Sequence, residues 1–410
     1  MSKRTLVTSA LPYANGPIHL GHLAGAYLPA DLYVRYKRLK DEDIIHICGS
    51  DEHGVPITIA SEKEGISPQD IVDKFHEQNK QIFEEFGIHF DYYGRTSSEV
   101  HHQTSQEFFT KLYEDDVFVQ KTEEQLYDPK AEMFLPDRYV KGTCPNCGYE
   151  EAYGDQCESC GTSLSPTELK NPKSAITGDT PETKETTHWY LPLGDFQERL
   201  EKWLDTRENW KPNVMGQVKS WLNDGLADRA VTRDLTWGVP VPLEDADGKV
   251  LYVWFDAPIG YISFTAKWCE EQTGDWENYK RWWQDPDAEI VHFIGEDNVV
   301  FHTIMWPAML MAEGNYQLPS EVVANCFLNI QFPGEEEQKI STSRGTAIWI
   351  EEYLEKYDPD PLRYYLTMIA PEDQRTAFQF DDLISRNNEE LVATFGNLVH
   401  RTMSFVHKYF

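Results

Sequence analysis

The order of strand-like and helix-like segments at the start of the chain constrains its fold most. An apolar run over residues 7–11 leads through a Gly-Pro turn at 16–17 into a helix-like stretch over 18–40, and a second apolar run covers 43–48. Strand, turn and helix in this order are typical of an α/β unit. The sequence therefore predicts a doubly wound, Rossmann-like parallel sheet.

Two more helices are expected from the residues that start them. Ser67 followed by Pro68 is a favourable start, with Ser as N-cap and Pro in the first turn. The string from Thr96 to Glu99 has the spacing of a capping box in which Thr96 is the N-cap. Both starts extend the α/β pattern.

The middle of the chain departs from this pattern and then returns to it. Between residues 117 and 229 the sequence has short strand-like pieces, four cysteines and Trp-rich helical segments, which predicts an insertion. Strand-like segments at 252–255, 289–294 and 322–328 resume the alternation, with a helix expected from Asn298. The sheet is expected to be completed there.

The last residues follow a regular apolar pattern. Leu391, Phe395, Leu398, Thr402, Phe405 and Tyr409 recur at intervals of three or four. This spacing predicts an amphipathic helix that runs to the last residue and needs a partner for its apolar stripe. We expect it to be the first helix of an incomplete helical bundle in a shortened chain.

The charge balance limits how the chain could meet nucleic acid. Its 410 residues include 69 Asp and Glu against 37 Lys and Arg, a formal charge of −32. Coating nucleic acid by bulk charge needs an excess of basic residues, so any such contact must be local. We interpret the acidity as a general surface property, of the kind that keeps proteins soluble at high salt.

Nothing in the sequence indicates export or membrane insertion. The first apolar residues stop at Pro12 without a signal-peptide cleavage site, and the longest nearly uncharged stretch, 299–312, is too short to cross a bilayer. Cys48, Cys269 and Cys326 form an odd, scattered set. We therefore expect a reducing, cytoplasmic setting.

The other four cysteines have the spacing of a metal-binding knuckle. The pattern is Cys-x2-Cys-x9-Cys-x2-Cys, with a glycine after each pair, at Cys144, Cys147, Cys157 and Cys160. Such turns let four thiolates converge on a tetrahedral Zn²⁺. Four protein ligands leave no open position, so we expect one structural zinc per chain, within about residues 140–165. A pair of disulfides is the alternative.

A His-x-Gly-His string directly follows the first strand and its turn. His19 and His22 share one face of the expected helix, and Gly21 lets a flat ring approach the backbone. The helix start offers N–H groups to anions. The string therefore favours a phosphate-handling site, and a simple cap plus a surface residue is the alternative.

Five strings in order along the chain carry a family resemblance. They cover residues 9–22, 48–54, 232–238, 254–261 and 293–297. Together they resemble the methionyl-tRNA synthetases, within the class I aminoacyl-tRNA synthetases. The resemblance implies that L-methionine reacts with ATP and Mg²⁺ to give methionyl-adenylate and pyrophosphate, and that methionine then passes to the terminal adenosine of tRNA(Met).

The resemblance also implies which residues handle the nucleotide. A carboxylate is already a nucleophile, so activation needs charge stabilisation and alignment of the phosphates. The implied catalytic residues are His19, His22, Lys339, Arg233 and Arg344. The implied ATP-binding residues are His19, Gly21, His22, Gly295, Asp297, Lys339, Ser341 and Ser343.

The family's second signature, a Lys-x-Ser-Lys-Ser loop, is altered in this chain. Residues 339–345 read Lys-Ile-Ser-Thr-Ser-Arg-Gly, so Thr342 replaces the second lysine. Our hypothesis is that Arg344 supplies the missing charge, in which case Arg344→Ala loses activation and Thr342→Lys is tolerated. From the string alone a plain surface loop is the alternative, next to three glutamates at 335–337.

Methionine is apolar and polarizable, so its pocket should combine aromatic walls with one anchor for the ammonium group. Asp51, at the end of the second strand, is the expected anchor. The other implied methionine-binding residues are Leu11, Tyr13, Trp254, Ala257, Pro258, Tyr261, His302 and Trp306, of which the last two share one face of the expected helix. Core packing is the alternative for the aromatic residues.

The resemblance divides the chain into five expected regions. They are the first half of the nucleotide-binding domain, the insertion, the second half, a signature-loop and stem-contact region, and the incomplete bundle, at 1–116, 117–229, 230–328, 329–385 and 386–410. The insertion is too small for the hydrolytic editing module of the Leu, Ile and Val relatives. Discrimination is therefore expected to rest on the pocket.

Two other functions stay open at this point. One is an enzyme of the same superfamily that activates a different small acid, and the other is an inactive relative that uses the knuckle to bind RNA or protein. Methionine-dependent exchange of pyrophosphate into ATP separates all three. We expect a monomer that forms the adenylate but charges tRNA weakly.

Overall fold

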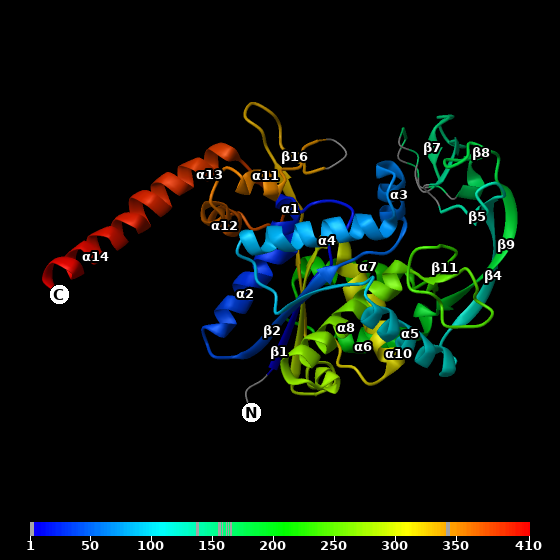
Figure 1. The fold of residues 1–410 in the computed structure, drawn as a ribbon, viewed down its shortest axis with the longest axis horizontal. Helices are drawn as coiled ribbons and strands as arrows, with labels where there is room; N and C mark the ends of the chain where they lie inside the picture. The colour runs from blue at the N-terminus through cyan, green and yellow to red at the C-terminus, as the bar shows by residue number, and fades with distance from the viewer. Residues whose placement is uncertain are drawn as a thin grey trace.

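The computed structural model describes residues 4–136, 139–154, 157, 159–160, 162, 164, 166–341 and 345–410 (Figure 1). At its centre lies a parallel sheet in the order β14-β13-β1-β2-β3. Its strands are β1 (Arg4–Ser9), β2 (Asp43–Ser50), β3 (Tyr92–Arg95), β13 (Ala288–Gly295) and β14 (Glu321–Asn325). The predicted doubly wound sheet is confirmed.

Helices cover both faces of this sheet, as a buried parallel sheet requires. Leu6, Ile45 and Ile290 face one core, and the neighbouring residues Val7 and Ile44 face another. The first face packs against α5 (Glu99–Glu114), α8 (Val253–Thr273) and α10 (Trp306–Glu313), and the second against α2 (Leu28–Arg38). Apolar residues on both sides of each strand explain why the strands read as continuous apolar runs.

The predicted long helix over 18–40 is made of three consecutive helical pieces. They are the short α1 (Leu20–His22), the π-helical η1 (Leu23–Tyr27) and α2. After β2 come α3 (Val55–Glu64) and α4 (Pro68–Glu85), and Ser67 forms a capping box with Asp70 at the start of α4. The predicted helix start at Ser67 is confirmed.

The predicted N-cap at Thr96 is wrong. Helix α5 begins at Glu99, and its N-cap is Ser98, whose side chain accepts a hydrogen bond from the His101 N–H. The Thr96 hydroxyl is used elsewhere, because it accepts a hydrogen bond from the Glu52 N–H at 2.9 Å. A tertiary contact therefore overrides the local capping signal.

Two predicted strands are also corrected. Residues 253–255 open helix α8 after the short β12 (Val250–Leu251), since a short apolar run does not distinguish strand from buried helix. The run over 322–328 is split between two sheets. Strand β14 ends at Asn325, and β15 (Leu328–Ile330) pairs with β16 (Gln338–Lys339) and β17 (Thr376–Phe378).

The predicted insertion contains two antiparallel sheets and two helices (Figure 1). One sheet is β10-β9-β4-β5, built on the long pairing of β4 (Val119–Asp128) with β9 (Glu182–Leu191). The other, β7-β6-β8, carries the cysteine knuckle. The remaining elements here are β5 (Met133–Phe134), β6 (Val140–Thr143), β7 (Ala152–Tyr153), η3 (Pro166–Glu168), β8 (Lys170–Ser174), η4 (Leu193–Phe196), α6 (Gln197–Leu204), α7 (Pro212–Asp224) and β10 (Arg229–Ala230).

The C-terminal part is helical and leads away from the body of the molecule (Figure 1). The predicted amphipathic helix is confirmed, but its stripe is open to solvent, with Phe395 and Leu398 62% and 64% exposed. The elements are α11 (Ile350–Leu354), α12 (Pro359–Met368), α13 (Phe380–Arg386), η8 (Asn387–Gly396) and α14 (Asn397–Tyr409). No helix in the described residues is long and apolar enough to span a bilayer.

Candidate active site

A cavity of about 450 Å³ opens at the carboxyl ends of β1, β2 and β13. The strand order reverses between β1 and β13, and ligands of open α/β sheets bind at such a switch point. Tyr13 follows β1, Asp51 follows β2 and Gly295 ends β13, and all three line the cavity. The sheet topology therefore brings together residues that are far apart in sequence.

The backbone fixes the protonation pattern of the two histidines. The Gly21 N–H donates to Nδ1 of His19 at 3.1 Å, and the His19 N–H donates to Nδ1 of His22 at 3.1 Å. An N–H group can only donate, so each Nδ1 is an acceptor and each neutral ring carries its proton on Nε2. The rings stack with centroids 3.7 Å apart and line the same cavity.

Burial keeps both rings neutral. It lowers the pKa of His19 to about 4 and that of His22 to about 3, and the proximity of His19 lowers the latter further. At neutral pH the pair therefore offers two Nε2–H donors without bringing positive charge. Donors held in place beforehand are the groups that stabilise charge developing on phosphate oxygens.

Gly21 is required by the close approach of the His19 ring. A Cβ on Gly21 would lie 3.0 Å from Cε1 and 3.2 Å from Nδ1 of that ring. Any larger residue would push His19 away from its hydrogen bond with the backbone. The nucleotide-binding role implied for Gly21 stays a prediction.

Three other nucleotide-handling candidates line the same cavity. They are Gly295, Asp297 and Lys339. The Lys339 ammonium lies 4.6 Å from the centre of the Phe327 ring. Burial raises the pKa of Asp297, and Lys339 acts in the opposite direction. A cation and the two half-buried histidines thus line one cavity.

The signature loop is only partly described. Ser341 does not line the cavity, and its N–H donates to Thr346 Oγ1 at 2.9 Å. Thr342, Ser343 and Arg344 lie outside the described residues. The roles implied for Ser341, Ser343 and Arg344 therefore stay predictions.

Asp51 lines the same cavity and is buried. The segment before it pairs with the residues after β1, since the Asp51 N–H donates to Pro12 O at 2.9 Å and the Ala14 N–H donates to Asp51 O at 2.8 Å. Burial raises the pKa of the Asp51 carboxyl, and the negative charge of Asp256 raises it further. A bound cation would relieve this cost, which suits an ammonium group.

Apolar and aromatic side chains form the walls beside Asp51. Trp254, Ala257, Pro258 and Tyr261 come from the first turns of α8, and Leu11 and His302 also line the cavity. The His302 ring donates from Nδ1 to Asn298 O at 3.1 Å, which leaves Nε2 to accept the Tyr261 hydroxyl at 3.0 Å. Burial lowers the pKa of His302 to about 4, so this ring is neutral.

Besides Ser341, two residues predicted for the site do not line the cavity. Trp306 is fully buried in the core, where its ring packs 6.0 Å from that of Trp283. Trp306 follows the π-helical turn η7 (Phe301–Met305) and packs into the core, whereas His302 lines the cavity. Arg233, in β11 (Thr232–Arg233), has its guanidinium carbon 4.0 Å from the centre of the Tyr252 ring. Tyr252 does not line the cavity, but the next residue, Val253, does.

Sequence reasoning missed several lining residues. These are Ala10, Pro12, Gly25, Ala26, Tyr27, Val253, Asn298, Phe301, Cys326, Phe327, Leu328 and Ile340. Most adjoin a predicted residue, so widening each motif by a few positions would have found them. Cys326, Phe327 and Leu328 join two different sheets, and no local signal indicates that.

The knuckle cysteines can hold a metal ion. Their four sulfur atoms lie within 4.8 Å of one another, with Cys144 to Cys160 at 3.9 Å and Cys147 to Cys157 at 3.6 Å. A tetrahedron with metal–sulfur bonds of about 2.3 Å has sulfur–sulfur edges of about 3.8 Å. All four are free cysteines, so the geometry favours a metal site over a pair of disulfides.

Comparison with known proteins assigns the family. Residues 5–403 match the family described as tRNA synthetases class I (M). The chain belongs to this family. The match covers nearly all the residues that build the central sheet, the insertion and the cavity. The family resemblance found in the sequence is confirmed.

Relatives agree with this family assignment. The chain is 58% identical to methionine-tRNA ligase of Salinibacter ruber over 100% of this chain and 58% of that protein. It is 59% identical to methionine-tRNA ligase of Bacteroides fragilis over 100% of this chain and 59% of that protein. The chain thus spans less than three fifths of the length of these curated relatives.

A solved structure has the same fold. Mycobacterium tuberculosis methionyl-tRNA synthetase, bound by methionyl-adenylate, superposes with a TM-score of 0.76 at 25% identity. The match covers 99% of this chain and 72% of that one. The two proteins therefore share their fold across almost the whole of this chain.

Proposed function

We propose that this chain carries the active site of a methionine-tRNA ligase. It activates L-methionine with ATP to methionyl-adenylate and pyrophosphate, and transfers methionine to the 3'-terminal adenosine of tRNA(Met). The observation that carries the proposal is a single cavity with two chemically different sets of lining residues. One set is the two Nε2–H donors with Lys339, and the other is Asp51 with apolar and aromatic side chains.

The first step follows from this arrangement. A carboxylate oxygen of methionine forms a bond to the α-phosphorus, the bond from that phosphorus to the bridging oxygen breaks, and pyrophosphate leaves with its Mg²⁺. The nucleophile needs no base, so the protein contributes alignment and charge stabilisation. His19 and His22 donate to the phosphate oxygens, and Lys339 adds positive charge.

The amino acid is held by its two polar ends and its apolar side chain. Asp51 pairs with the ammonium group, which directs the carboxylate towards the nucleotide. Trp254, Pro258 and Tyr261 surround the thioether, a soft and polarizable group that packs well against aromatic rings. Selection of methionine then rests on the shape and polarity of this wall.

The transfer step brings tRNA to an acidic protein. With a formal charge of −32, the chain binds tRNA through local contacts, including its terminal adenosine at the cavity. We place the protein in the cytoplasm, where tRNA is charged, and expect a monomer. A Zn²⁺ held by the four knuckle thiolates is structural, since it has no open position for substrate.

The exchange of labelled pyrophosphate into ATP tests the proposal. Each of the twenty amino acids is supplied in turn, and the rate is compared with a reaction lacking amino acid. The proposal expects exchange with methionine above all others. Exchange driven by a different amino acid would assign another substrate, and no exchange with any would favour the inactive binding module.

A further inference from the structure

Three consecutive buried side chains after β2 point in different directions. Asp51 lines the cavity, while Glu52 and His53 are 0% and 2% exposed and do not line it. Burying an ionisable group is costly unless it has a partner. Each of these side chains therefore needs a group from another element, and those groups hold the segment in place.

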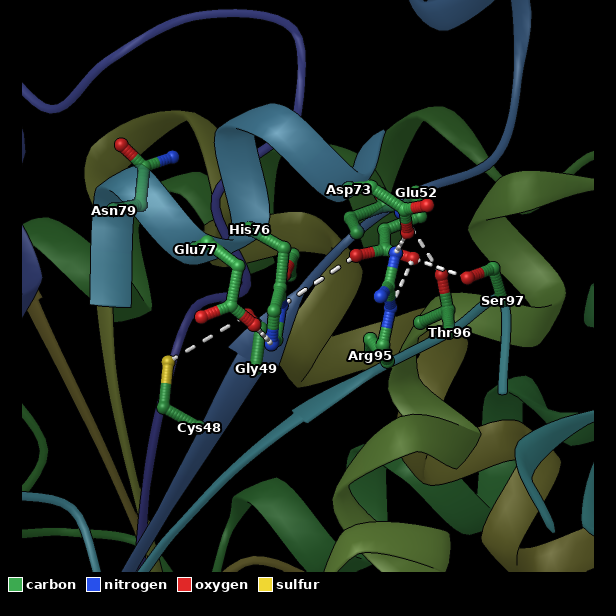
Figure 2. Close-up of polar contacts among 12 residues, drawn as sticks. Cys48, Gly49, Glu52, Asp73, His76, Glu77, Asn79, Arg95, Thr96 and Ser97 are labelled. Atoms are coloured by element: carbon green, nitrogen blue, oxygen red, sulfur yellow. Dashed lines mark hydrogen bonds and ion pairs between the residues drawn. The ribbon is translucent and has the colours of Figure 1, made fainter. Parts of the chain in front are cut away.

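Glu52 is held on the side of β3. Its carboxylate accepts from Arg95 Nε at 3.0 Å and from the Ser97 hydroxyl, and these side chains converge in Figure 2. Its carbonyl accepts from Trp237 Nε1 at 2.6 Å. The segment is thus fixed to the sheet through Glu52, away from the cavity.

His53 is held on the side of α8. Its Nδ1 lies 2.5 Å from Oδ2 of Asp256, which is 0% exposed. Burial alone would raise the pKa of the Asp256 carboxyl, but the charge of His53 and a hydrogen bond from His101 hold it below its usual value. A short, buried hydrogen bond therefore joins His53 to α8.

Asp256 lies between two residues that line the cavity, Trp254 and Ala257, on the first turns of α8. The His53 N–H in turn points towards Oδ1 of Asp51 at 3.4 Å. A continuous chain of contacts thus runs from the aromatic wall through Asp256 and His53 to the Asp51 carboxylate. The two linking residues, Asp256 and His53, do not line the cavity themselves.

We infer that Asp256 is a positioning residue that acts through His53 to set the Asp51 carboxylate against the α8 wall. The inference rests on the proposed function, in which Asp51 binds the ammonium group and α8 surrounds the side chain of the amino acid. Loss of the link misaligns these two halves of the amino-acid site. The nucleotide-handling set, built on α1 and β16, is left as it is.

A metal ion is the competing explanation for this cluster. Ligand atoms of His53, His101 and Asp256 lie within 4.8 Å of one another, and Oδ1 of Asp256 has no partner among the described residues. The His101 ring is already in contact with Ser263 Oγ at 3.0 Å and Ser105 Oγ at 3.1 Å. A cation would have to displace these contacts, so the geometry favours hydrogen bonds.

The test compares Asp256→Asn, His53→Gln and the double variant with the intact chain. The KM for methionine in pyrophosphate exchange is expected to rise about 10- to 100-fold in each, with the KM for ATP within about twofold. The double variant should resemble the worse single variant, because both changes break one link. Dissociation constants for methionine, measured by equilibrium dialysis without ATP, should follow the KM values.

His46→Gln is the matched control. His46 is a fully buried histidine in β2, the strand that leads to His53, and its Nε2 lies 2.9 Å from Ser9 Oγ, away from the cavity. Its replacement is expected to lower stability and leave the KM for methionine unchanged. A merely structural role for Asp256 would give the same pattern in Asp256→Asn as in this control.

Three results would overturn the inference. The first is a KM and a dissociation constant for methionine in Asp256→Asn that stay within about twofold of wild type. The second is an equal change in the KM for methionine and in the KM for ATP. The third is the loss of one bound metal ion per chain in Asp256→Asn, measured by elemental analysis. If the intact chain neither binds methionine nor exchanges pyrophosphate, the proposed function and the inference both fail. Activity in the intact chain with an unshifted variant removes the inference alone.

Discussion

Neutral, buried imidazole is the recurring theme at the scale of single residues. His19 and His22 are donors because the backbone occupies their Nδ1 atoms, and His302 accepts from Tyr261 because its Nδ1 donates to a carbonyl. Burial lowers the pKa of all three to about 3 or 4. These histidines therefore act as oriented dipoles at neutral pH, and a sequence pattern alone cannot show which nitrogen carries the proton.

The cost of such burial is measurable at His46, outside the site. Burial lowers its pKa from 6.5 to about 3 in the folded protein, with a smaller opposite effect of Asp31. Between these values the unfolded chain binds a proton that the folded chain does not, so stability falls as the pH falls below 6.5. From pH 7 to pH 5 this residue should remove about 2 kcal/mol from the free energy of unfolding.

Denaturant unfolding of wild type and His46→Gln at both pH values measures this effect. From pH 7 to pH 5, the free energy of unfolding should fall by about 2 kcal/mol more in wild type than in His46→Gln. Other groups titrate equally in both proteins and cancel in the comparison. An unchanged difference would show that His46 is not neutral in the folded state.

At the scale of elements, strand ends were the most predictable part of the site. Tyr13, Asp51 and Gly295 follow buried apolar runs, and parallel strands bring their carboxyl ends together whatever the loops do. The strand predicted at 252–255 was wrong, because an apolar run of this length fits a strand or a buried helix equally well. Trp306 lies in the core instead, because a four-residue spacing predicts a shared helix face but not which part of that face reaches the cavity.

The knuckle is the element whose fold depends most on a ligand. Its small sheet, β7-β6-β8, has few buried apolar residues, and Cys144 and Cys157 are among them. Four thiolates without a metal would repel one another, so metal binding and folding of this element should be coupled. Cys269 is buried but far from the cluster in sequence, which makes it a matched control.

Replacing one ligand should therefore remove the metal. Wild type and Cys269→Ser are expected to hold one zinc per chain by elemental analysis, and Cys144→Ser to hold far less. Hydrogen exchange should become fast in residues 140–174 of Cys144→Ser and stay slow in the central sheet. A metal-free wild-type protein with a protected knuckle would contradict a structural zinc.

At the scale of the whole molecule, the charge of −32 is the dominant feature. Few acidic groups take part in the cavity, and most of the 69 Asp and Glu residues contribute to a general repulsion. Salt screens this repulsion over about 8 to 10 Å at moderate ionic strength. The folded state brings the charges closer together than the unfolded chain does, so it gains more from screening.

Added salt should therefore stabilise the protein. The thermal midpoint is expected to rise steadily between 0.05 and 1 M KCl, on the order of several degrees. Potassium sulfate is avoided, because excluded salts stabilise by a different route. A midpoint that falls as KCl is added would contradict this account of the acidity.

The central claim is that two neutral histidines at the switch point stabilise the transferring phosphate. It is tested most directly by the rate of methionine-dependent pyrophosphate exchange in wild type and His22→Ala, at saturating methionine and ATP. The account predicts a drop of about 10²- to 10³-fold, as for removal of one preorganised donor, with the dissociation constant for methionine unchanged. An exchange rate in His22→Ala equal to that of wild type would contradict it.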